Sequence, residues 1–207
     1  MQDAVFEEFE AKLCAAVSRL RVGDGADSAT EVGPLVTRAQ QKRVLGYLDI
    51  GVAEGARIAA QAPLPDDPRL ADGFYVAPTV LTDVTPGMRV AKEEIFGPVV
   101  TLIPFTDEDE AVRIANGTPF GLVAAVFSSN SDRALRVSRQ IRAGIVFVNN
   151  YLRIALGTGF GGVGHSGFGR EHAQETLAEY GYTKAIRLAT NRDELPYWTA
   201  ATRVLEG

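Results

Sequence analysis

The stretch Glu93-Glu94-Ile95-Phe96-Gly97-Pro98-Val99 is the part of the sequence from which the fold can best be inferred. Two adjacent carboxylates precede a large aromatic ring, and the Gly-Pro pair then fixes a turn into an apolar run. A carboxylate accepts hydrogen bonds from hydroxyl groups, and a ring packs against a flat surface. The stretch therefore indicates a place that binds a flat, hydroxyl-bearing ligand. From the residues alone, a structural role in which Glu94 and Phe96 simply pin a loop stays open.

Downstream of this stretch, apolar runs alternate with helical patterns. The runs predict strands at Val99 to Phe105, Leu122 to Phe127 and Ile145 to Val148. Helices are predicted between them, over Asp107 to Ala115 with Thr106 as its N-cap, and from Ser131 to a close at Gly144. This order predicts right-handed crossovers and an α/β fold with a parallel sheet and helices on both faces.

The first part of the chain reads as two helices and a short strand. Residues 3 to 20 repeat apolar side chains at helical spacing. Thr37 has the character of an N-cap, with Gln40 as its capping-box partner, and Gly55 is placed to end that helix. Arg57 to Ala60 is a short-strand candidate, and a loop rich in proline and aspartate follows over residues 61–73.

Composition narrows the possible functions. The 207 residues carry a formal net charge of −5, with 46% hydrophobic and 23% charged residues, as in ordinary packed domains. The sequence has no basic stripe, so neither nucleic acid nor an anionic membrane is expected as a partner. No apolar run approaches the roughly 20 residues that span a bilayer. One cysteine, Cys14, fits a reducing compartment, so a cytoplasmic protein is expected. The two histidines are too few for a metal site, and none is expected.

The character of the sequence changes after residue 150, which predicts an α/β part over 1–150 and a second part over 151–207. The second part has seven glycines in thirteen positions from Gly157 to Gly169, a short helix over about Arg170 to Glu179, a strand at Thr183 to Leu188 and a C-terminal arm. Gly162 to Gly167 fits the pattern G-x-G-x-x-G. No predicted strand feeds it and no acidic residue about twenty positions on supports it, so backbone freedom for a bend is the favoured interpretation.

Six landmarks of the sequence are similar, in the same order, to those of NAD(P)-dependent aldehyde dehydrogenases. They are Val32-Gly33-Pro34-Leu35, Gly73 to Thr79, Glu93 to Val99, Asn116 to Leu122, Ala143 to Asn149, and Phe160-Gly161-Gly162 with Ser166 to Glu171. The resemblance covers about Val5 to Leu188. It implies the parallel-sheet, three-layer catalytic domain of that family, with Thr183 to Leu188 as an oligomerisation strand. It also implies oxidation of an aldehyde to a carboxylic acid with NAD or NADP, through a cysteine thiolate and a general-base glutamate.

The resemblance gives individual residues a role. Glu94 resembles the glutamate that hydrogen-bonds the nicotinamide ribose, and Phe96 resembles the aromatic residue beside the nicotinamide ring. Phe160 resembles an aromatic residue of the substrate tunnel, although the residue before it is not the proline that the family often has. Asn149 and Asn150 are expected at a strand end near the same cleft, where α/β sheets usually bind ligands.

The nucleophile, the general base and the dinucleotide-binding domain of the family have no counterpart in this sequence. The chain therefore resembles the C-terminal, catalytic-domain half alone, and no catalytic residue is assigned. Cys14 lies between Leu13 and Ala15 in a predicted helix, and we expect it to be a packing residue. We expect the lone chain to be inactive and to bind NAD or NADP weakly or not at all. Activity would need a separate chain that supplies the missing half, or a longer polypeptide of which this chain is a piece.

Two other functions stay open. The chain could be a non-catalytic oligomerisation or interaction module, for instance a degenerate gene product, or a small-ligand binding domain that reuses the tunnel. An unpaired strand at Thr183 to Leu188 favours a homo-oligomer over an edge strand of the chain's own sheet.

Overall fold

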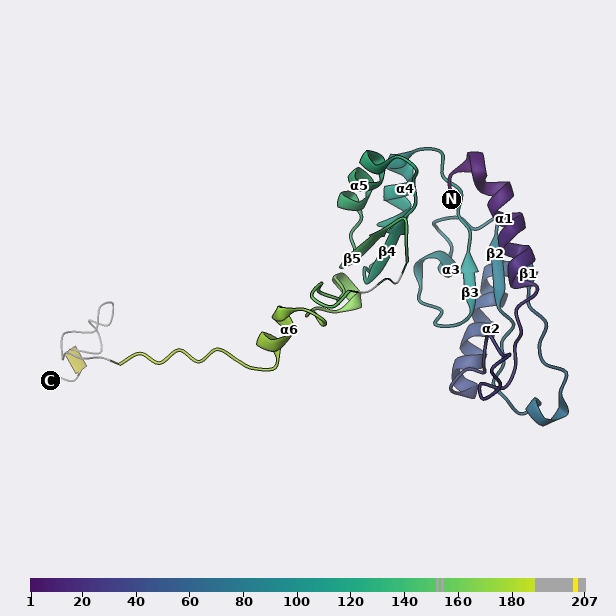
Figure 1. Cartoon of the computed structure of the whole chain (residues 1–207), viewed down its shortest axis with the longest axis horizontal. Coiled ribbons are helices and arrows are strands. Elements are labelled where there is room, and N and C mark those ends of the chain that lie inside the picture. Colours follow the sequence, from purple (N-terminus) through teal and green to yellow (C-terminus); the bar gives the residue numbers. More distant parts are fainter. Residues whose placement is uncertain (152, 154, 189–202, 205–207) are drawn as a thin grey trace.

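The computed structural model describes residues 1–151, 153, 155–188 and 203–204, and its helices and strands lie in two groups (Figure 1). The first group consists of α1 (Asp3–Val17), α2 (Arg38–Ala53), β1 (Arg57–Gln61), a 3₁₀ turn (Pro68–Leu70), β2 (Thr79–Thr82), α3 (Arg89–Lys92) and β3 (Val99–Thr101). The second group consists of α4 (Glu108–Ala115), β4 (Val123–Val126), α5 (Ser131–Gln140) and β5 (Ile145–Val148). A 3₁₀ turn (Gly164–Ser166) and α6 (Gln174–Glu179) follow.

The core of the first group lies between α2 and the three-stranded sheet. One face of α2 is buried at the spacing of an amphipathic helix, by Val44, Tyr47, Leu48 and Gly51. This face packs on Leu81 of β2 and on Val90 of α3. The sequence pattern of α2 therefore fixes the position of α3 and of the residues that follow it.

Strand pairing confirms the α/β class and modifies the predicted sheet. β2 pairs in parallel with β3, and β4 pairs in parallel with β5, whereas β1 runs antiparallel to β2. The expectation of one continuous parallel sheet is wrong for the described residues, because β3 and β4 lie in separate sheets. Nor are these strands covered on both faces: all residues of β4 and β5 are half-buried, and Val100 of β3 is 48% exposed. The predicted strand over Val99 to Phe105 is shorter than expected, since Pro104 has no N–H with which to continue a ladder.

Of the two N-caps predicted from the sequence, the structure confirms one and replaces the other. Thr37 Oγ1 accepts the Gln40 backbone N–H at 3.1 Å, which confirms this N-cap. The predicted capping box is wrong in its second bond. The Gln40 side chain donates to backbone carbonyls of Ile95 and Phe96 and makes no bond with Thr37. The cap of α4 is Asp107, whose Oδ1 accepts Glu110 N–H at 2.8 Å, and not Thr106, which donates to the Glu110 carboxylate.

The glycine-rich segment docks against the residues that lead into β4. The Val163 N–H donates to Gly121 O at 3.0 Å, and the His165 N–H donates to Pro119 O at 3.0 Å. A 3₁₀ turn stands where a dinucleotide fingerprint would place a strand-to-helix junction, which agrees with the interpretation of these glycines as a bend. α6 starts only at Gln174, later than the helix predicted from Arg170.

Beyond α6 the chain extends away from both groups of elements (Figure 1). Residues 183–188 are exposed and form no strand with any described residue, so the predicted strand is not confirmed within this chain. The predicted C-terminal arm lies almost entirely outside the described residues, and the division at residue 150 stays a prediction. No helix in the described part of the chain has the length and apolar character needed to cross a bilayer.

Candidate functional site: the Glu93–Gly97 turn

The turn over residues 93–97 is held against α2 by its backbone. Gln40 Nε2 donates to the carbonyl oxygens of Ile95, at 3.1 Å, and Phe96, at 2.8 Å. Arg43 Nη2 donates to the carbonyl oxygen of Glu94 at 2.6 Å. Gln40 and Arg43 lie three residues apart, on one face of α2, so one helix surface binds three consecutive carbonyls of the turn.

Packing fixes the other side of the same turn. Phe96 has φ of +57°, in the left-handed region that few non-glycine residues adopt. At Gly97, a Cβ atom would lie 2.5 Å from Cγ2 of Val44, which is fully buried, so only glycine fits there. The Thr79 N–H donates to Pro98 O at 2.9 Å and joins the end of the turn to β2. The backbone is therefore constrained by both α2 and the sheet.

The side chains of Glu94 and Phe96 are free although the backbone of the turn is not. Glu94 is exposed, and neither of its carboxylate oxygens accepts a hydrogen bond from any described residue. Phe96 is 74% exposed, whereas Ile95 between them is buried at 9%. The turn thus uses Ile95 as its apolar anchor and presents an acceptor carboxylate and an aromatic ring to solvent.

The neighbouring carboxylate, Glu93, has a different role. Arg89 donates to both of its oxygens, at 2.8 and 2.9 Å, and the Tyr47 hydroxyl donates to Oε2 at 2.7 Å. These bonds, first from Arg89 and then from Tyr47, lower the pKa of Glu93 to about 2. The guanidinium groups of Arg43 and Arg89 also lie over the Tyr47 ring, at 5.3 and 5.7 Å from its centroid. Glu93 therefore fastens the start of the turn to α2 and α3.

Sequence reasoning missed these supporting residues. The sequence predicts Gln40 only as a capping-box partner, and it predicts no role for Arg43 or Tyr47. A helical spacing of polar and aromatic groups over positions 40, 43 and 47 was the available signal. This spacing predicts which residues share a face of α2, but it does not predict which loop that face contacts.

A cleft of about 390 Å³ lies beside Glu94, between the two groups of elements. One wall is Ala91 to Glu94, and the other contains Leu122 to Ala124, Arg142 and Ser166. Among the residues predicted for the site, only Glu94 lines this cleft. The polar groups of the second wall are engaged in holding the turn before β4: Arg142 Nη2 donates to the carbonyl oxygens of residues 116 and 118, and Ser166 Oγ accepts the N–H of residue 121.

Asn149 and Asn150 lie at the carboxyl end of β5, as expected. Asn149 Oδ1 accepts Ser128 N–H at 2.8 Å and its Nδ2 donates to Ser128 O at 3.0 Å, so this amide ties the ends of β4 and β5 together. Asn150 Nδ2 donates to Val148 O at 2.8 Å, while its Oδ1 is buried and accepts no hydrogen bond from the described residues. Asn150 therefore retains a free acceptor at the strand end, and Asn149 does not.

Phe160 lies within the glycine-rich segment. Its backbone pairs with Glu171 through two hydrogen bonds of 2.9 and 2.8 Å, and its ring lies 5.8 Å from the ring of His172. The structure thus brings Glu94 and Phe96 together in one turn, and Asn149 and Asn150 together at one strand end. Phe160 stands apart from both pairs in the sequence, and its role toward a substrate stays a prediction.

Cys14 has the surroundings of a packing residue. It lies half-buried on α1, and burial is the main cause that raises the pKa of its thiol, with the nearby Glu10 carboxylate adding to the rise and Arg57 opposing it. A nucleophilic cysteine needs the opposite shift, because the thiolate is the reactive form. That Cys14 does not replace the family's nucleophile stays a prediction, which the raised pKa of its thiol supports.

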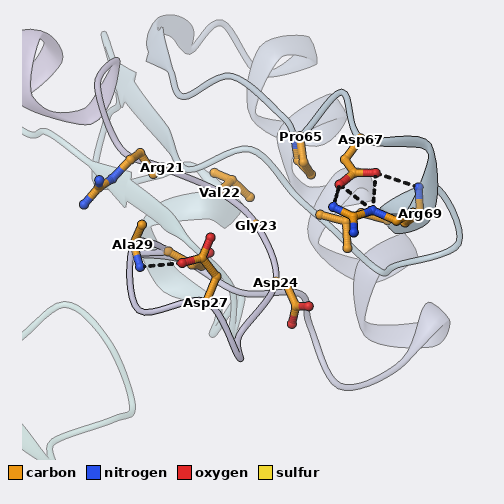
Figure 2. A pocket seen from close by; sticks show the side chains of 11 residues that line it. Arg21, Val22, Gly23, Asp24, Asp27, Ala29, Pro65, Asp67 and Arg69 are labelled. Atoms are coloured by element: carbon orange, nitrogen blue, oxygen red, sulfur yellow. Dashed lines mark hydrogen bonds and ion pairs between the residues drawn. The ribbon is translucent and has the colours of Figure 1, made fainter.

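A second cavity, of about 480 Å³, lies between the loop over residues 21–30 and the loop over residues 65–70 (Figure 2). Each charged group of its lining has a partner: Arg21 pairs with Glu31 at 3.7 Å, and the others bind one another or nearby backbone. Arg69 binds Asp67, lowers the pKa of that carboxyl to about 2, and points back onto its own loop. Asp27 accepts the Ala29 N–H at 2.8 Å. These contacts organise the two loops. Among the described residues there is no cluster of three potential metal ligands, here or elsewhere.

Comparison with known proteins identifies the family of the chain. The model of the aldehyde dehydrogenase family matches residues 1–186. The chain is 47% identical over 201 residues to an aldehyde dehydrogenase of Didymella fabae, covering 97% of this chain and 41% of that protein. The chain belongs to the aldehyde dehydrogenase family. It is also 41% identical over 191 residues to a betaine aldehyde dehydrogenase of Brucella anthropi, covering 92% of this chain and 39% of that protein.

Solved structures of the family show the same fold. A betaine aldehyde dehydrogenase from Staphylococcus aureus, crystallised in complex with NAD+, superposes with a TM-score of 0.85 at 37% identity. The superposition covers 95% of this chain and 39% of that one. The chain therefore spans about two fifths of the length of the relatives that it matches.

Proposed function

We propose that this chain is the C-terminal, catalytic-domain half of an NAD(P)-dependent aldehyde dehydrogenase, and that it oxidises an aldehyde to a carboxylic acid only together with the remaining part of the family polypeptide. The observation that carries the proposal is the turn over residues 93–97. Its backbone is bound by Gln40 and Arg43, while Glu94 and Phe96 are free to meet a ligand. A purely structural turn has no need of an exposed ring beside an unpaired carboxylate.

The residues of the turn fit the nicotinamide end of the cofactor. Glu94 offers carboxylate oxygens that accept hydrogen bonds from ribose hydroxyls, and the Phe96 ring offers an apolar face to a flat heterocycle. When bound, the nicotinamide supplies the acceptor for the hydride that leaves the aldehyde carbon. The part of this chain is to orient the nicotinamide end, since α2 fixes the backbone from which both side chains project before the ligand arrives.

The same geometry explains why the chain alone should bind the dinucleotide weakly. The described residues that fit the pattern G-x-G-x-x-G form a 3₁₀ turn, so they do not open a helix toward a pyrophosphate. A few contacts to ribose do not offset the entropy cost of association. Whether NAD or NADP is the cofactor depends on contacts to the ribose phosphate that these residues do not make.

Covalent chemistry has to come from the complementing part. Aldehyde oxidation in this class of reaction begins with attack of a thiolate on the carbonyl carbon, and the raised pKa of Cys14 makes it unsuited to that attack. On the substrate side we assign Phe160, Asn149 and Asn150 to the walls. Of the two amides, Asn150 is the better candidate for direct contact, because its Oδ1 is free among the described residues.

Complementation tests this function. The purified chain is combined with the remaining portion of a full-length relative, and NAD+ and NADP+ reduction is followed with a panel of aldehydes. We expect no turnover from the chain alone and turnover from the mixture. Glu94→Gln should raise KM for the dinucleotide in the mixture, while Cys14→Ser should change nothing. Turnover by the lone chain that Cys14→Ser abolishes would show that the proposal is wrong.

A second candidate function is a non-catalytic assembly module. After α6, the large side chains of Tyr182, Ile186 and Leu188 are 84–85% exposed and all lie at even-numbered positions, which share one side of an extended segment. Such a segment adds readily to the sheet of another molecule, so we assign Thr183 to Leu188 to a homo-oligomer contact. Light scattering of the full chain and of a chain ending at Gly181 tests this: we expect assembly in the first and a monomer in the second. Equal masses would contradict it.

A further inference from the structure

Arg170 lies beside the segment that carries Phe160, and it is half-buried. Its Nη1 donates to Gly162 O at 2.9 Å and to Gly169 O at 2.6 Å. These backbone carbonyls are the only hydrogen-bond partners of its side chain among the described residues. Hydrogen bonds from a charged donor are stronger than those between neutral groups, so one guanidinium nitrogen firmly joins two parts of the glycine-rich segment.

The stem of the same side chain covers the two glycines on either side of Phe160. A Cβ atom at Gly159 would lie 3.4 Å from the Cβ, Cγ and Cδ atoms of Arg170. A Cβ atom at Gly161 would lie 2.9 Å from Nη1 and 3.0 Å from Cδ of Arg170, and it would overlap Gly169 O. Gly161 therefore leaves the space that the guanidinium occupies, because a side chain there would meet both Arg170 and the backbone.

This packing fixes the side of the segment from which the Phe160 ring projects. Phe160 pairs with Glu171 as an antiparallel bridge, so its backbone is extended. Successive residues of an extended segment face opposite sides, so the two flanking glycines share the side that Arg170 fills. The Phe160 ring takes the other side, where it lies 5.8 Å from the ring of His172.

The backbone of Arg170 is held by α6. Its N–H donates to Glu179 Oε1 at 2.9 Å, and its carbonyl oxygen accepts the Thr176 hydroxyl at 2.8 Å. The same hydroxyl accepts the Ala173 N–H at 3.3 Å, directly ahead of the helix. Arg170 therefore connects α6 with the segment that carries Phe160.

We propose that Arg170 is a positioning residue for aldehyde oxidation, and that it acts by holding the Phe160 ring toward the substrate. The inference rests on the proposed function, because that function assigns Phe160 to the substrate wall. It goes further by naming the residue that sets the direction of the ring, and the helix to which that residue is fastened. This role does not require Arg170 itself to touch the aldehyde.

Substitutions at Arg170 can separate its hydrogen bonds from its packing. Methionine has a long unbranched stem without a strong donor, so it can cover the glycines but cannot join the two carbonyls. Lysine keeps a charged donor and loses the planar guanidinium, so it can bind the carbonyls less precisely. A role that depends on the hydrogen bonds should therefore be lost with methionine and partly restored with lysine.

The first measurement needs no substrate. The lone native chain, Arg170→Met and Arg170→Lys are compared by NMR, and the observable is the nuclear Overhauser contact between the rings of Phe160 and His172. Arg139→Met is the matched control, because Arg139 is an exposed arginine of α5 whose side chain makes no hydrogen bond with any described residue. Two other ring pairs, with centroids 6.1 Å apart in each, are internal references: Phe120 with His165, and Phe147 with Tyr151.

We expect the contact between Phe160 and His172 to be lost in Arg170→Met, partly kept in Arg170→Lys and unchanged in the control. The amides of Phe160 and Glu171, which donate to each other's carbonyls, should exchange about ten-fold faster in Arg170→Met. Both reference pairs should persist. An unchanged contact in Arg170→Met would overturn the proposal. Loss of all three ring contacts would also overturn it, because Arg170 would then be needed for folding in general.

The second measurement is the steady-state kinetics of the complemented mixture. In Arg170→Met, KM for the aldehyde should rise about five-fold or more, while KM for NAD+ and kcat stay near their native values. Arg170→Lys should recover part of this loss. A native KM for the aldehyde in Arg170→Met would overturn the proposal even if the ring contact were lost. A mixture containing the native chain that shows no turnover would refute the proposed function, and the ring contact would still decide whether Arg170 directs Phe160.

Discussion

Replacement of Gln40 by alanine should release the turn that carries Glu94 and Phe96. The Gln40 side chain makes two hydrogen bonds to that turn, to Ile95 O at 3.1 Å and to Phe96 O at 2.8 Å. Each hydrogen bond of this kind makes a net contribution to stability of about 0.5–1.5 kcal/mol. Their loss should lower the free energy of local opening by about 1–3 kcal/mol, which corresponds to a roughly 5- to 150-fold faster exchange.

The amides of Glu93 and Val99 report this opening. They flank the turn and are themselves hydrogen-bonded, to Arg89 O and Gly97 O at 2.9 and 2.8 Å. Gln41→Ala is the matched control, because Gln41 is the next residue of α2 and its amide also donates to a backbone carbonyl, that of Tyr75 at 2.9 Å. The two variants remove the same side chain from the same helix and release different segments.

We expect Glu93 and Val99 to exchange faster in Gln40→Ala and at the native rate in Gln41→Ala. Global stability, measured by urea unfolding, should fall modestly in both variants. Unchanged exchange in Gln40→Ala, or equal acceleration in both variants, would refute the idea that α2 positions the turn.

Three further results are expected. Gly97→Ala should destabilise the fold by about 1–3 kcal/mol in urea unfolding, because its new methyl group would lie 2.5 Å from a methyl of the fully buried Val44; native stability would contradict this. The pKa of Glu93 is lowered from 4.5 to about 2, chiefly by Arg89, so its contribution to stability is complete above pH 4.5 and is lost as pH falls toward 2. Glu93→Gln should remove that part of the acid dependence of the urea midpoint, and an unaltered dependence would count against it. Asn130→Ala should cost about 1 kcal/mol, since Asn130 Oδ1 caps α5 at 2.9 Å, and a thermal melt that does not move would contradict this cap.

Local patterns in the sequence predicted where most helices and strands lie, because the periodicity of apolar residues within a segment indicates its secondary structure. The helical spacing of apolar residues located α2, and the apolar run Ile145 to Val148 coincides with β5. The capping residue was harder to choose where several candidates adjoin. Thr106 and Asp107 are both good caps by type, and only the backbone geometry shows that the carboxylate of Asp107 accepts the bond.

Sheet topology could not be predicted in the same way. The order of strands and helices correctly predicts a parallel β4–β5 pair, but nothing local tells that β3 pairs only with β2 among the described residues. Pairing between strands is a property of the whole fold, and β-branched residues are equally suited to a paired and an open edge. The faces of β3, β4 and β5 also stay partly exposed among the described residues, although their apolar sequences predict strands covered on both faces.

For the site, sequence and structure contributed different parts. The residues Glu94 and Phe96 were identified by residue type and by resemblance, and the structure shows both exposed on one turn. The support from Gln40 and Arg43 was invisible in the sequence, because the contact joins positions more than fifty residues apart. Asn149 and Asn150 look alike in the sequence, and their hydrogen bonds alone separate a structural amide from one with a free acceptor.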